Sequence, residues 1–236
     1  MNLVGDFHVH TVASGDAFST IEELSKKGKE IGLEVIAITD HGPAMAASSH
    51  RYYFDSLSNN IKEANGIRIL PGVEANIIEE NGSLDLPEKT IEKLSFTIIS
   101  FHTFSWKEDD IKSNTRALIN CINKYPNIKA IAHLNKPYFD LDMTEIIPHL
   151  IKKSIAIELN SRALESDRKN WGNYRRIISN MESLGVKFII SSDAHSLQQL
   201  GDFNSAIEFA KYCGLREENI VNTSIDKLKN YLCLDL

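Results

Sequence analysis

The sequence predicts an α/β fold in which a parallel sheet closes, or nearly closes, into a barrel. Short apolar runs alternate with longer amphipathic stretches about seven times along the 236 residues. Each unit is close to the ~30 residues of a βα repeat. Nearly every apolar run also ends on a side chain that can bind a metal, and barrel proteins build their sites from the C-terminal ends of several strands.

The predicted strands are short runs rich in Val, Ile and Phe, and each ends in a polar or charged side chain. In chain order they cover residues 3–10, 34–39, 67–73, 96–101, 130–132, 155–159 and 186–190. The polar side chains at or just beyond these ends are His8 with His10, His41, Glu74, His102, His133, Asn160, and Asp193 with His195.

Helical patterns separate the strands. Ser19 and Glu22 have the spacing of a capping box, which marks the start of the first helix. Pro148 falls inside another helix, where we expect a kink or a break. Asn81-Gly82 predicts a hairpin after the third strand. The predicted helices cover residues 19–31, 55–64, 113–125, 143–153, 167–184, 197–212 and 224–232.

Composition indicates one globular domain over residues 1–236, with 42% hydrophobic and 25% charged residues. The net charge of −6 weighs against a nucleic-acid partner. The chain starts without a signal-peptide pattern, and no apolar run reaches the ~20 residues of a membrane helix. Cys121, Cys213 and Cys233 are widely spaced and fit reduced thiols, so we expect a cytoplasmic protein without a membrane partner.

The first strand carries a histidine pair. Side chains two residues apart on a strand point the same way, so Asp6, His8 and His10 are predicted to share one face. Two imidazoles on one face can hold one metal ion.

The candidate ligands combine imidazole nitrogens with carboxylate oxygens and include no thiolate. Such a set suits zinc, manganese or iron, with zinc expected first. Nine ligands exceed what one ion takes, so we expect two to three divalent ions held close together. Clustered divalent ions activate water and clamp phosphate oxygens, which predicts phosphoester hydrolysis. The candidates are His8, His10, Asp16, His41, Glu74, His102, His133, Asp193 and His195.

Six segments, in order and over nearly the whole chain, resemble motifs of the PHP (polymerase and histidinol phosphatase) superfamily, and most closely its stand-alone YcdX-like phosphatases. They are Asp6-Phe7-His8-Val9-His10-Thr11, Ile38-Thr39-Asp40-His41-Gly42, Gly72-Val73-Glu74, Ser100-Phe101-His102, Ile131-Ala132-His133 and Ser192-Asp193-Ala194-His195. The resemblance implies a distorted (β/α)7 barrel with a trinuclear metal site at the C-terminal ends of the strands.

The resemblance also implies a role for each ligand. His8, His10, Glu74 and Asp193 would surround a first ion. Glu74 would bridge to a second ion held by His102 and His133, and His41 and His195 would hold a third. Close relatives carry a histidine where this chain has Asp16, which can still act as a ligand.

Other residues near the strand ends have two readings each. Asp6 and Asp40 are either partners that orient imidazoles or loop residues. Arg162 and Lys136 are candidate phosphate-binding cations. Glu158 and Asn160 are either ligand-orienting or structural. The aromatic residues 52–54, Phe104 and Trp106 either wall a substrate pocket or pack against helices.

The function expected from these residues is metal-dependent hydrolysis of a small phosphomonoester by an activated water. Glu74, Asp193 and His195 are the candidate catalytic residues. Two alternatives stay open: a phosphodiesterase or 3′–5′ exonuclease, and a metal-binding module without activity. The expected partner is a small phosphorylated substrate, and the sequence leaves a homo-oligomer open.

Overall fold

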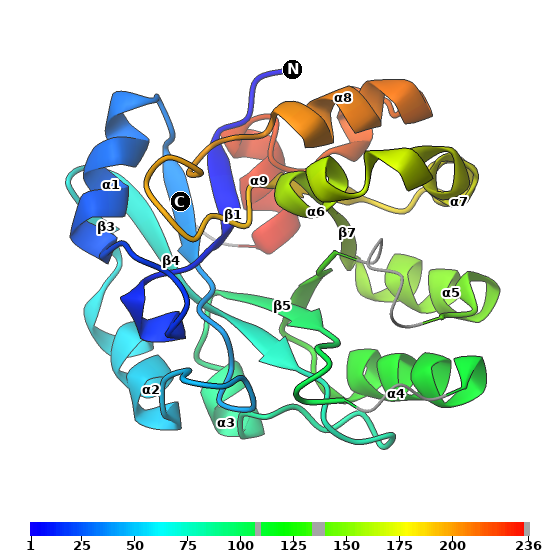
Figure 1. The fold of residues 1–236 in the computed structure, drawn as a ribbon, viewed down its shortest axis with the longest axis horizontal. Helices are drawn as coiled ribbons and strands as arrows, with labels where there is room; N and C mark the ends of the chain where they lie inside the picture. Colours follow the sequence, from blue (N-terminus) through cyan, green and yellow to red (C-terminus); the bar gives the residue numbers. More distant parts are fainter. Residues whose placement is uncertain (107–109, 134–139, 234–236) are drawn as a thin grey trace.

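Seven parallel strands form the sheet of the computed structural model, which describes residues 1–106, 110–133 and 140–233 (Figure 1). Hydrogen bonding joins them in the order β1-β2-β4-β5-β6-β7-β8, and a two-residue β3 pairs antiparallel with β4. The predicted α/β barrel is therefore confirmed. The strands are β1 (Gly5–Val9), β2 (Val35–Ile38), β3 (Glu63–Ala64), β4 (Ile67–Asn76), β5 (Phe96–Ser100), β6 (Ile128–Ile131), β7 (Ala156–Asn160) and β8 (Phe188–Ser191).

Helices surround this sheet, with α1 and α2 on one side and α4, α5 and α7 on the opposite side in Figure 1. Among the described residues, none of the helices is long and apolar enough to cross a bilayer. The helices are α1 (Ile21–Glu30), α2 (Arg51–Asn60), α3 (Glu88–Ile91), α4 (Ile111–Lys124), α5 (Met143–Lys153), α6 (Ser161–Ser166), α7 (Trp171–Ser183), α8 (Asn204–Cys213) and α9 (Ile225–Leu232), with 3-10 turns at Val12–Ser14, Arg168–Asn170 and Glu217–Asn219.

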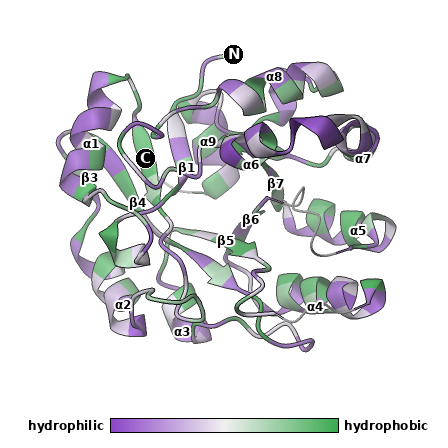
Figure 2. Ribbon diagram, in the orientation of Figure 1, coloured by the Kyte–Doolittle hydropathy of each residue, from purple (hydrophilic) through white to green (hydrophobic). Residues whose placement is uncertain are grey.

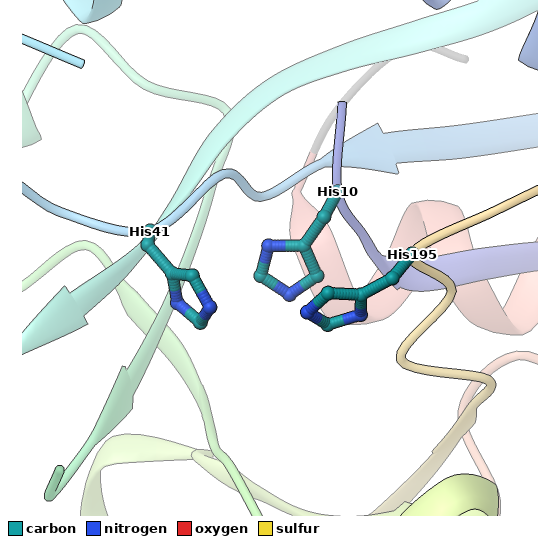
Figure 3. Close-up of side chains that lie close together, drawn as sticks. All are labelled: His10, His41 and His195. Carbon is teal, nitrogen blue, oxygen red and sulfur yellow. The ribbon is translucent and has the colours of Figure 1, made fainter. Parts of the chain in front are cut away.

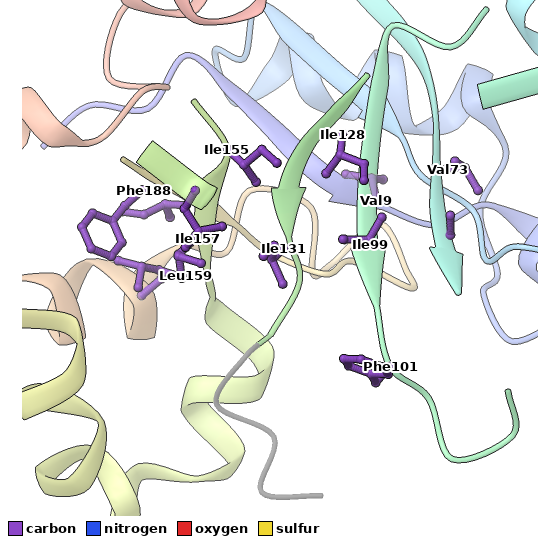
Figure 4. Packing of buried hydrophobic residues seen from close by; sticks show 14 of the residues in the cluster. Val9, Val73, Ile99, Phe101, Ile128, Ile131, Ile155, Ile157, Leu159 and Phe188 are labelled. Atoms are coloured by element: carbon purple, nitrogen blue, oxygen red, sulfur yellow. The ribbon is translucent and has the colours of Figure 1, made fainter. Parts of the chain in front are cut away.

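Alternating strand residues build two hydrophobic layers. One layer lies between the sheet and the helices, and Ile99, Ile131 and Ile157 belong to it (Figure 4). The other fills the inside of the barrel and includes Phe7 and Phe96, whose ring centroids are 5.4 Å apart. Figure 2 shows that the helices mix hydrophobic and hydrophilic residues, while β5 in the sheet is mainly hydrophobic.

Helix α9 covers the end of the barrel opposite the strand C-termini. Its Leu228 and Leu232 belong to the inner layer and are buried. Tyr231 donates a hydrogen bond to the carbonyl of Lys129 in β6, and its hydroxyl accepts one from the N–H of Ala156 in β7. The apolar inside is thus shielded from water at that end, and only the other end is left for a polar site.

Among the described residues, β1 and β8 bond directly to each other only at their C-terminal ends. There Val9 forms a parallel bridge with Ala194. The N–H of His10 donates to the Ala194 carbonyl at 2.9 Å, and the N–H of Ala194 donates to the His8 carbonyl at 3.2 Å. These bonds bring the histidines of the first strand beside the loop that follows the last strand.

Toward the N-terminal ends of β1 and β8, the two strands do not pair with each other, and the segment 220–222 lies between them. We call this place the seam. The carbonyl of Asn222 accepts from the N–H of Val4. Its fully buried side chain accepts from the N–H of Ile190 and donates to the carbonyls of Ile190 and Gly5. One amide side chain therefore replaces ladder hydrogen bonds that the two strands cannot make with each other.

Strand β1 is irregular between Asp6 and Val9, where three steps along β1 match two steps along β2. His8 and His10 lie together as predicted, with ring centroids 5.0 Å apart. The prediction that Asp6 shares their face is wrong. The extra residue turns its carboxylate away, and it accepts hydrogen bonds from the N–H groups of Ser192 and Gly201 instead.

Several helix boundaries differ from the prediction for local reasons. The capping box of α1 uses Thr20 and Glu23, because Ser19 belongs to the preceding loop, where its carbonyl accepts from Val12. Helix α2 begins at Arg51, where the side chain of His50 caps it, and it ends at Asn60, so the predicted helical residues 61–64 instead form a short link and β3.

In the second half of the chain, α5 continues through Pro148, so the expected break does not occur. The N–H that proline lacks would bond only the carbonyl of Thr144, so a single bond is lost. The predicted helix 167–184 is a 3-10 turn followed by α7, and α8 begins only at Asn204. The predicted hairpin at Asn81-Gly82 is present as a bridge between Ile77 and Leu84.

The seam leads to a prediction about stability. Asn222→Ala leaves the N–H of Ile190 and two carbonyls buried without their partner, and each such group costs about 1–3 kcal/mol. We expect urea denaturation to show a free energy of unfolding lower by roughly 3 kcal/mol. Asn59→Ala, which removes an exposed amide on α2, serves as the control, with a change of about 0.5 kcal/mol or less. Equal stability of the two variants would contradict this account of the seam.

Candidate metal centre

Glu74 lies at the centre of a cluster of histidines at the C-terminal end of the barrel. Its Oε1 is 2.7 Å from His133 Nε2 and 3.4 Å from His102 Nε2. Its Oε2 is 2.7 Å from His41 Nδ1 and 3.3 Å from His8 Nε2. The two carboxylate oxygens thus face two different sets of nitrogens, which is the arrangement that a bridging carboxylate requires.

A second part of the cluster lies around His10. Its Nε2 is 3.3 Å from Asp193 Oδ1, and its ring centroid is 4.3 Å from that of His41 and 4.2 Å from that of His195. Figure 3 shows the three rings turned toward one another from separate strands and loops. Asp16 approaches the same place, with Oδ2 3.4 Å from His41 Nε2 and 3.5 Å from His195 Nε2.

Buried polar partners fix the orientation of three of these histidines through their Nδ1 atoms. His8 Nδ1 is 2.7 Å from Glu158 Oε1, and His102 Nδ1 is 2.7 Å from Asn76 Oδ1. His10 Nδ1 lies 2.9 Å from Ser14 Oγ. A proton held on Nδ1 leaves the lone pair on Nε2, and Nε2 is the atom of all three rings that faces the carboxylates of the cluster.

These partners answer questions that the sequence left open. Glu158 orients a candidate ligand, because it holds His8 and also accepts from the N–H of His133. Asn160 donates to Asp193 Oδ2 at 3.2 Å. Asn76 and its half-buried partner Asp85, which share a 2.6 Å hydrogen bond, were not predicted from the sequence. The position of Asn76 two residues after Glu74 on β4 was the available signal.

The residues present fit divalent ions. Six buried side-chain atoms of the described residues lack a hydrogen-bond partner, and four of them belong to this cluster: His8 Nε2, His10 Nε2, His41 Nδ1 and Glu74 Oε2. Buried polar atoms are rarely left without a partner, so this concentration points to a bound cation. Three sets offer ligand atoms within 4.8 Å of one another: His8, His10 and Asp193; His41, Glu74 and His102; and His10, His41 and His195.

The backbone is strained at two of the candidate ligands. His133 has φ 29° and Asp193 has φ 59°, a region that non-glycine residues seldom adopt. Such conformations persist where the surrounding structure imposes them, and they concentrate at functional sites.

Charge and burial shift the pKa values of the cluster in both directions. Burial opposes the charged rings of His8 and His41, but neighbouring carboxylates raise the pKa of His8 well above its usual value and that of His41 to about 10, so a cation binding there would displace their protons. Burial works against the ionised form of Glu74, but His102, His8 and His41 outweigh it and keep the pKa of Glu74 well below its usual range. Burial lowers the pKa of His10 to about 4, so its ring is neutral near pH 7. The hydrogen bond with His41 lowers the pKa of Asp16 to about 2.

A cavity of about 430 Å³ opens over this cluster. Arg162 is the one arginine among its described lining residues, which include no lysine, and its Nη1 is 2.7 Å from His195 Nδ1. The other proposed phosphate-binding residue, Lys136, lies outside the described residues. The lining residues are Asp16, His41, Met45, Glu74, His102, His133, Arg162, Ala163, Ser166, Asp193 and His195.

The remaining candidates take other places. Asp6 does not orient an imidazole but holds the loop that carries Asp193 and His195, through its bonds to Ser192 and Gly201. The aromatic residues 52–54, Phe104 and Trp106 are absent from the described cavity lining. Trp106 packs on Phe101, with ring centroids 5.3 Å apart, which supports the packing alternative for this residue.

Fold and site together define an α/β-barrel protein with a cluster of histidines and carboxylates suited to divalent ions. The model of the PHP domain matches residues 6–162, and this chain belongs to that family. A protein named "Probable phosphatase" from Thermoanaerobacter sp. (strain X514) is 38% identical over 234 residues, which are 98% of this chain and 95% of that protein. Another "Probable phosphatase", from Acetivibrio thermocellus, is 35% identical and covers 98% of this chain and 96% of its own.

Among solved structures, the chain is similar to histidinol phosphate phosphatase from Lactococcus lactis complexed with zinc, L-histidinol and phosphate. The TM-score is 0.64 at 21% identity, and the match covers 92% of this chain and 95% of that one. At this identity the similarity shows a shared fold.

The central position of Glu74 is tested by Glu74→Gln, which keeps the size of the side chain and removes its charge. We expect elemental analysis to show the loss of at least one ion per chain, with zinc affinity lower by about tenfold or more. Glu92→Gln changes an exposed glutamate and serves as the control. Full metal occupancy in Glu74→Gln would contradict the proposal that Glu74 bridges two ions.

Asp16 is tested by two substitutions because, at 52% side-chain exposure, it is far more accessible than the histidines beside it. We expect Asp16→Ala to weaken one ion selectively. Asp16→His should keep or raise zinc affinity at that place, because imidazole is a good zinc ligand. Zinc titration of both variants checks this, and unchanged stoichiometry and affinity in Asp16→Ala would exclude Asp16 from the ligand set.

Proposed function

We propose that this protein is a metal-dependent phosphatase that hydrolyses small phosphomonoesters. The observation that carries the proposal is the group of buried ligand atoms without protein partners, gathered around Glu74 at the base of a cavity that Arg162 also lines. The name "Probable phosphatase" of relatives that align over 98% of this chain supports the reaction class.

The proposed cofactors are two to three divalent ions, with zinc as the first candidate and manganese or iron as alternatives. Zinc in the Lactococcus lactis structure and the three ligand sets of this chain support the choice. Ions bound there would supply an activated water and neutralise phosphate oxygens. His8, His10, His41, Glu74, His102, His133, Asp193 and His195 would hold them, with Asp16 as the exposed ninth ligand.

Arg162 is proposed to bind the phosphate. In the present arrangement its guanidinium, which can only donate, contacts Nδ1 of His195. Binding of an ion through Nε2 requires the proton on Nδ1, which has a second acceptor in the Asp193 carbonyl at 3.0 Å. The donors of Arg162 would then be available to phosphate oxygens, for which its planar fork is well suited.

Asp193 and His195 are the proposed groups for moving the proton to the leaving oxygen, because both line the cavity beside Arg162. The cavity volume of about 430 Å³ lies toward the small end of ligand sites, which supports a compact substrate. A single arginine, with no lysine, among its described lining residues supports a substrate with one phosphate rather than a polynucleotide.

The proposal is tested with zinc- or manganese-loaded protein on p-nitrophenyl phosphate and on bis(p-nitrophenyl) phosphate. We expect faster release from the monoester, loss of activity after chelation and recovery when metal is restored. A preference for the diester would favour the phosphodiesterase alternative. Inactivity of fully loaded protein toward a library of phosphomonoesters would favour the module without catalytic activity.

Arg162→Ala tests the phosphate contact in the same assay. We expect KM for the monoester to rise by at least tenfold, about the 1.4 kcal/mol or more of a lost charged hydrogen bond, while metal content stays the same. Arg168→Ala is the control, because Arg168 pairs with Glu165 and Glu208 on the surface. An unchanged KM in Arg162→Ala would refute its role.

A further inference from the structure

Ser14 occupies a place in the hydrogen-bond network that neither the motifs nor the proposed reaction explains. It ends the 3-10 turn after β1, and only 1% of it is exposed. Its hydroxyl lies 2.7 Å from Asp40 Oδ1, 2.9 Å from His10 Nδ1 and 3.1 Å from the backbone nitrogen of His41. One buried oxygen thus touches two candidate ligands that come from different strands.

The direction of each of these hydrogen bonds follows from the chemistry of its partners. The Asp40 carboxylate accepts only, so the single hydroxyl proton of Ser14 goes to Asp40. The backbone N–H of His41 donates to the Ser14 oxygen. The remaining contact leaves the oxygen as acceptor, so His10 must donate its Nδ1 proton. The lone pair of His10 is therefore on Nε2, the atom that faces Asp193.

Asp40 is held firmly enough to impose this direction. Its Oδ1 also accepts from the N–H of Thr11 at 2.6 Å, and its Oδ2 accepts from the hydroxyls of Thr11 and Tyr53 at 2.9 and 2.5 Å. Tyr53 comes from α2, so a helix outside the sheet helps to fix the carboxylate. With this many donors around it, the Asp40 carboxylate stays in place as the acceptor for Ser14.

We propose that Ser14, anchored by Asp40, is a positioning residue that fixes the Nδ1–H tautomer of His10 and the backbone of His41, and so sets metal affinity at two ligands together. This inference rests on the metal centre of the proposed function. It differs from the usual partner of one ligand histidine, because a single hydroxyl serves two ligands.

The test is zinc affinity measured by chelator competition on Ser14→Ala and on Ser49→Ala. The Ser49 hydroxyl donates to the carbonyl of Ala13 and so contacts the same turn without touching a ligand. We expect Ser14→Ala to weaken zinc binding by about 10- to 100-fold and to affect more than one ion. Ser49→Ala should bind zinc within about twofold of the unchanged protein, since it removes no partner of a ligand.

A second measurement needs no substitution. Nitrogen-15 NMR of the metal-free protein, with the His10 signals assigned, should show the proton on Nδ1. A proton on Nε2 would overturn the proposal even if Ser14→Ala failed to fold. Equal zinc affinity of the folded Ser14→Ala variant and the Ser49→Ala control would also overturn it.

The outcomes separate this inference from the proposed function. If the unchanged protein binds no divalent ion, the metal centre itself is wrong. If it binds zinc and hydrolyses phosphomonoesters while Ser14→Ala binds zinc equally well, only the role of Ser14 is wrong.

Discussion

The rest of the site depends on one buried carboxylate among imidazoles. Glu74 is 1% exposed and lies near His8, His41, His102 and His133. A carboxylate removed from water is costly unless opposite charge compensates it. The neighbouring rings can compensate it only if they carry protons or share cations with it. Glu158 and Asn76 contact Nδ1 of His8 and His102, which leaves the Nε2 lone pair of each ring to bind a cation. The fold places these Nε2 atoms at the end of the barrel that α9 does not cover.

The sequence predicted the barrel and the location of the site well, because both depend on local patterns. Apolar runs of strand length, each ending in a histidine or an acid, indicate the strands and the end at which their side chains meet. What it could not predict was the irregularity in β1. One extra residue between Asp6 and Val9 reverses the direction of a single side chain, and the pairing with β2 that produces it is absent from the local pattern.

The partners that orient the ligands were the hardest part to predict. Glu158 and His8 are 150 residues apart in sequence, and Ser14 reaches Asp40 across 26 residues. Serine, asparagine and glutamate are common in loops and strand ends, so their identity alone does not indicate such contacts. Asp85 illustrates the difficulty, because it supports Asn76 from a loop that carries no recognisable motif. The ligands themselves were easier to find because histidine is rarer and recurred at successive strand ends.

The seam has a consequence for how the chain assembles during its synthesis. The segment 220–222 leaves the ribosome long after β1, since Asn222 lies 217 residues beyond Gly5, yet its hydrogen bonds join β1 to β8. His8 and His10 therefore emerge long before the contacts that hold them beside Asp193 can be completed. A ribosome-bound chain ending before residue 220 would expose histidines and acids that have not yet been gathered into one site. Capture of metal ions by the complete centre is thus tied to the synthesis of a segment that follows every candidate ligand in the sequence.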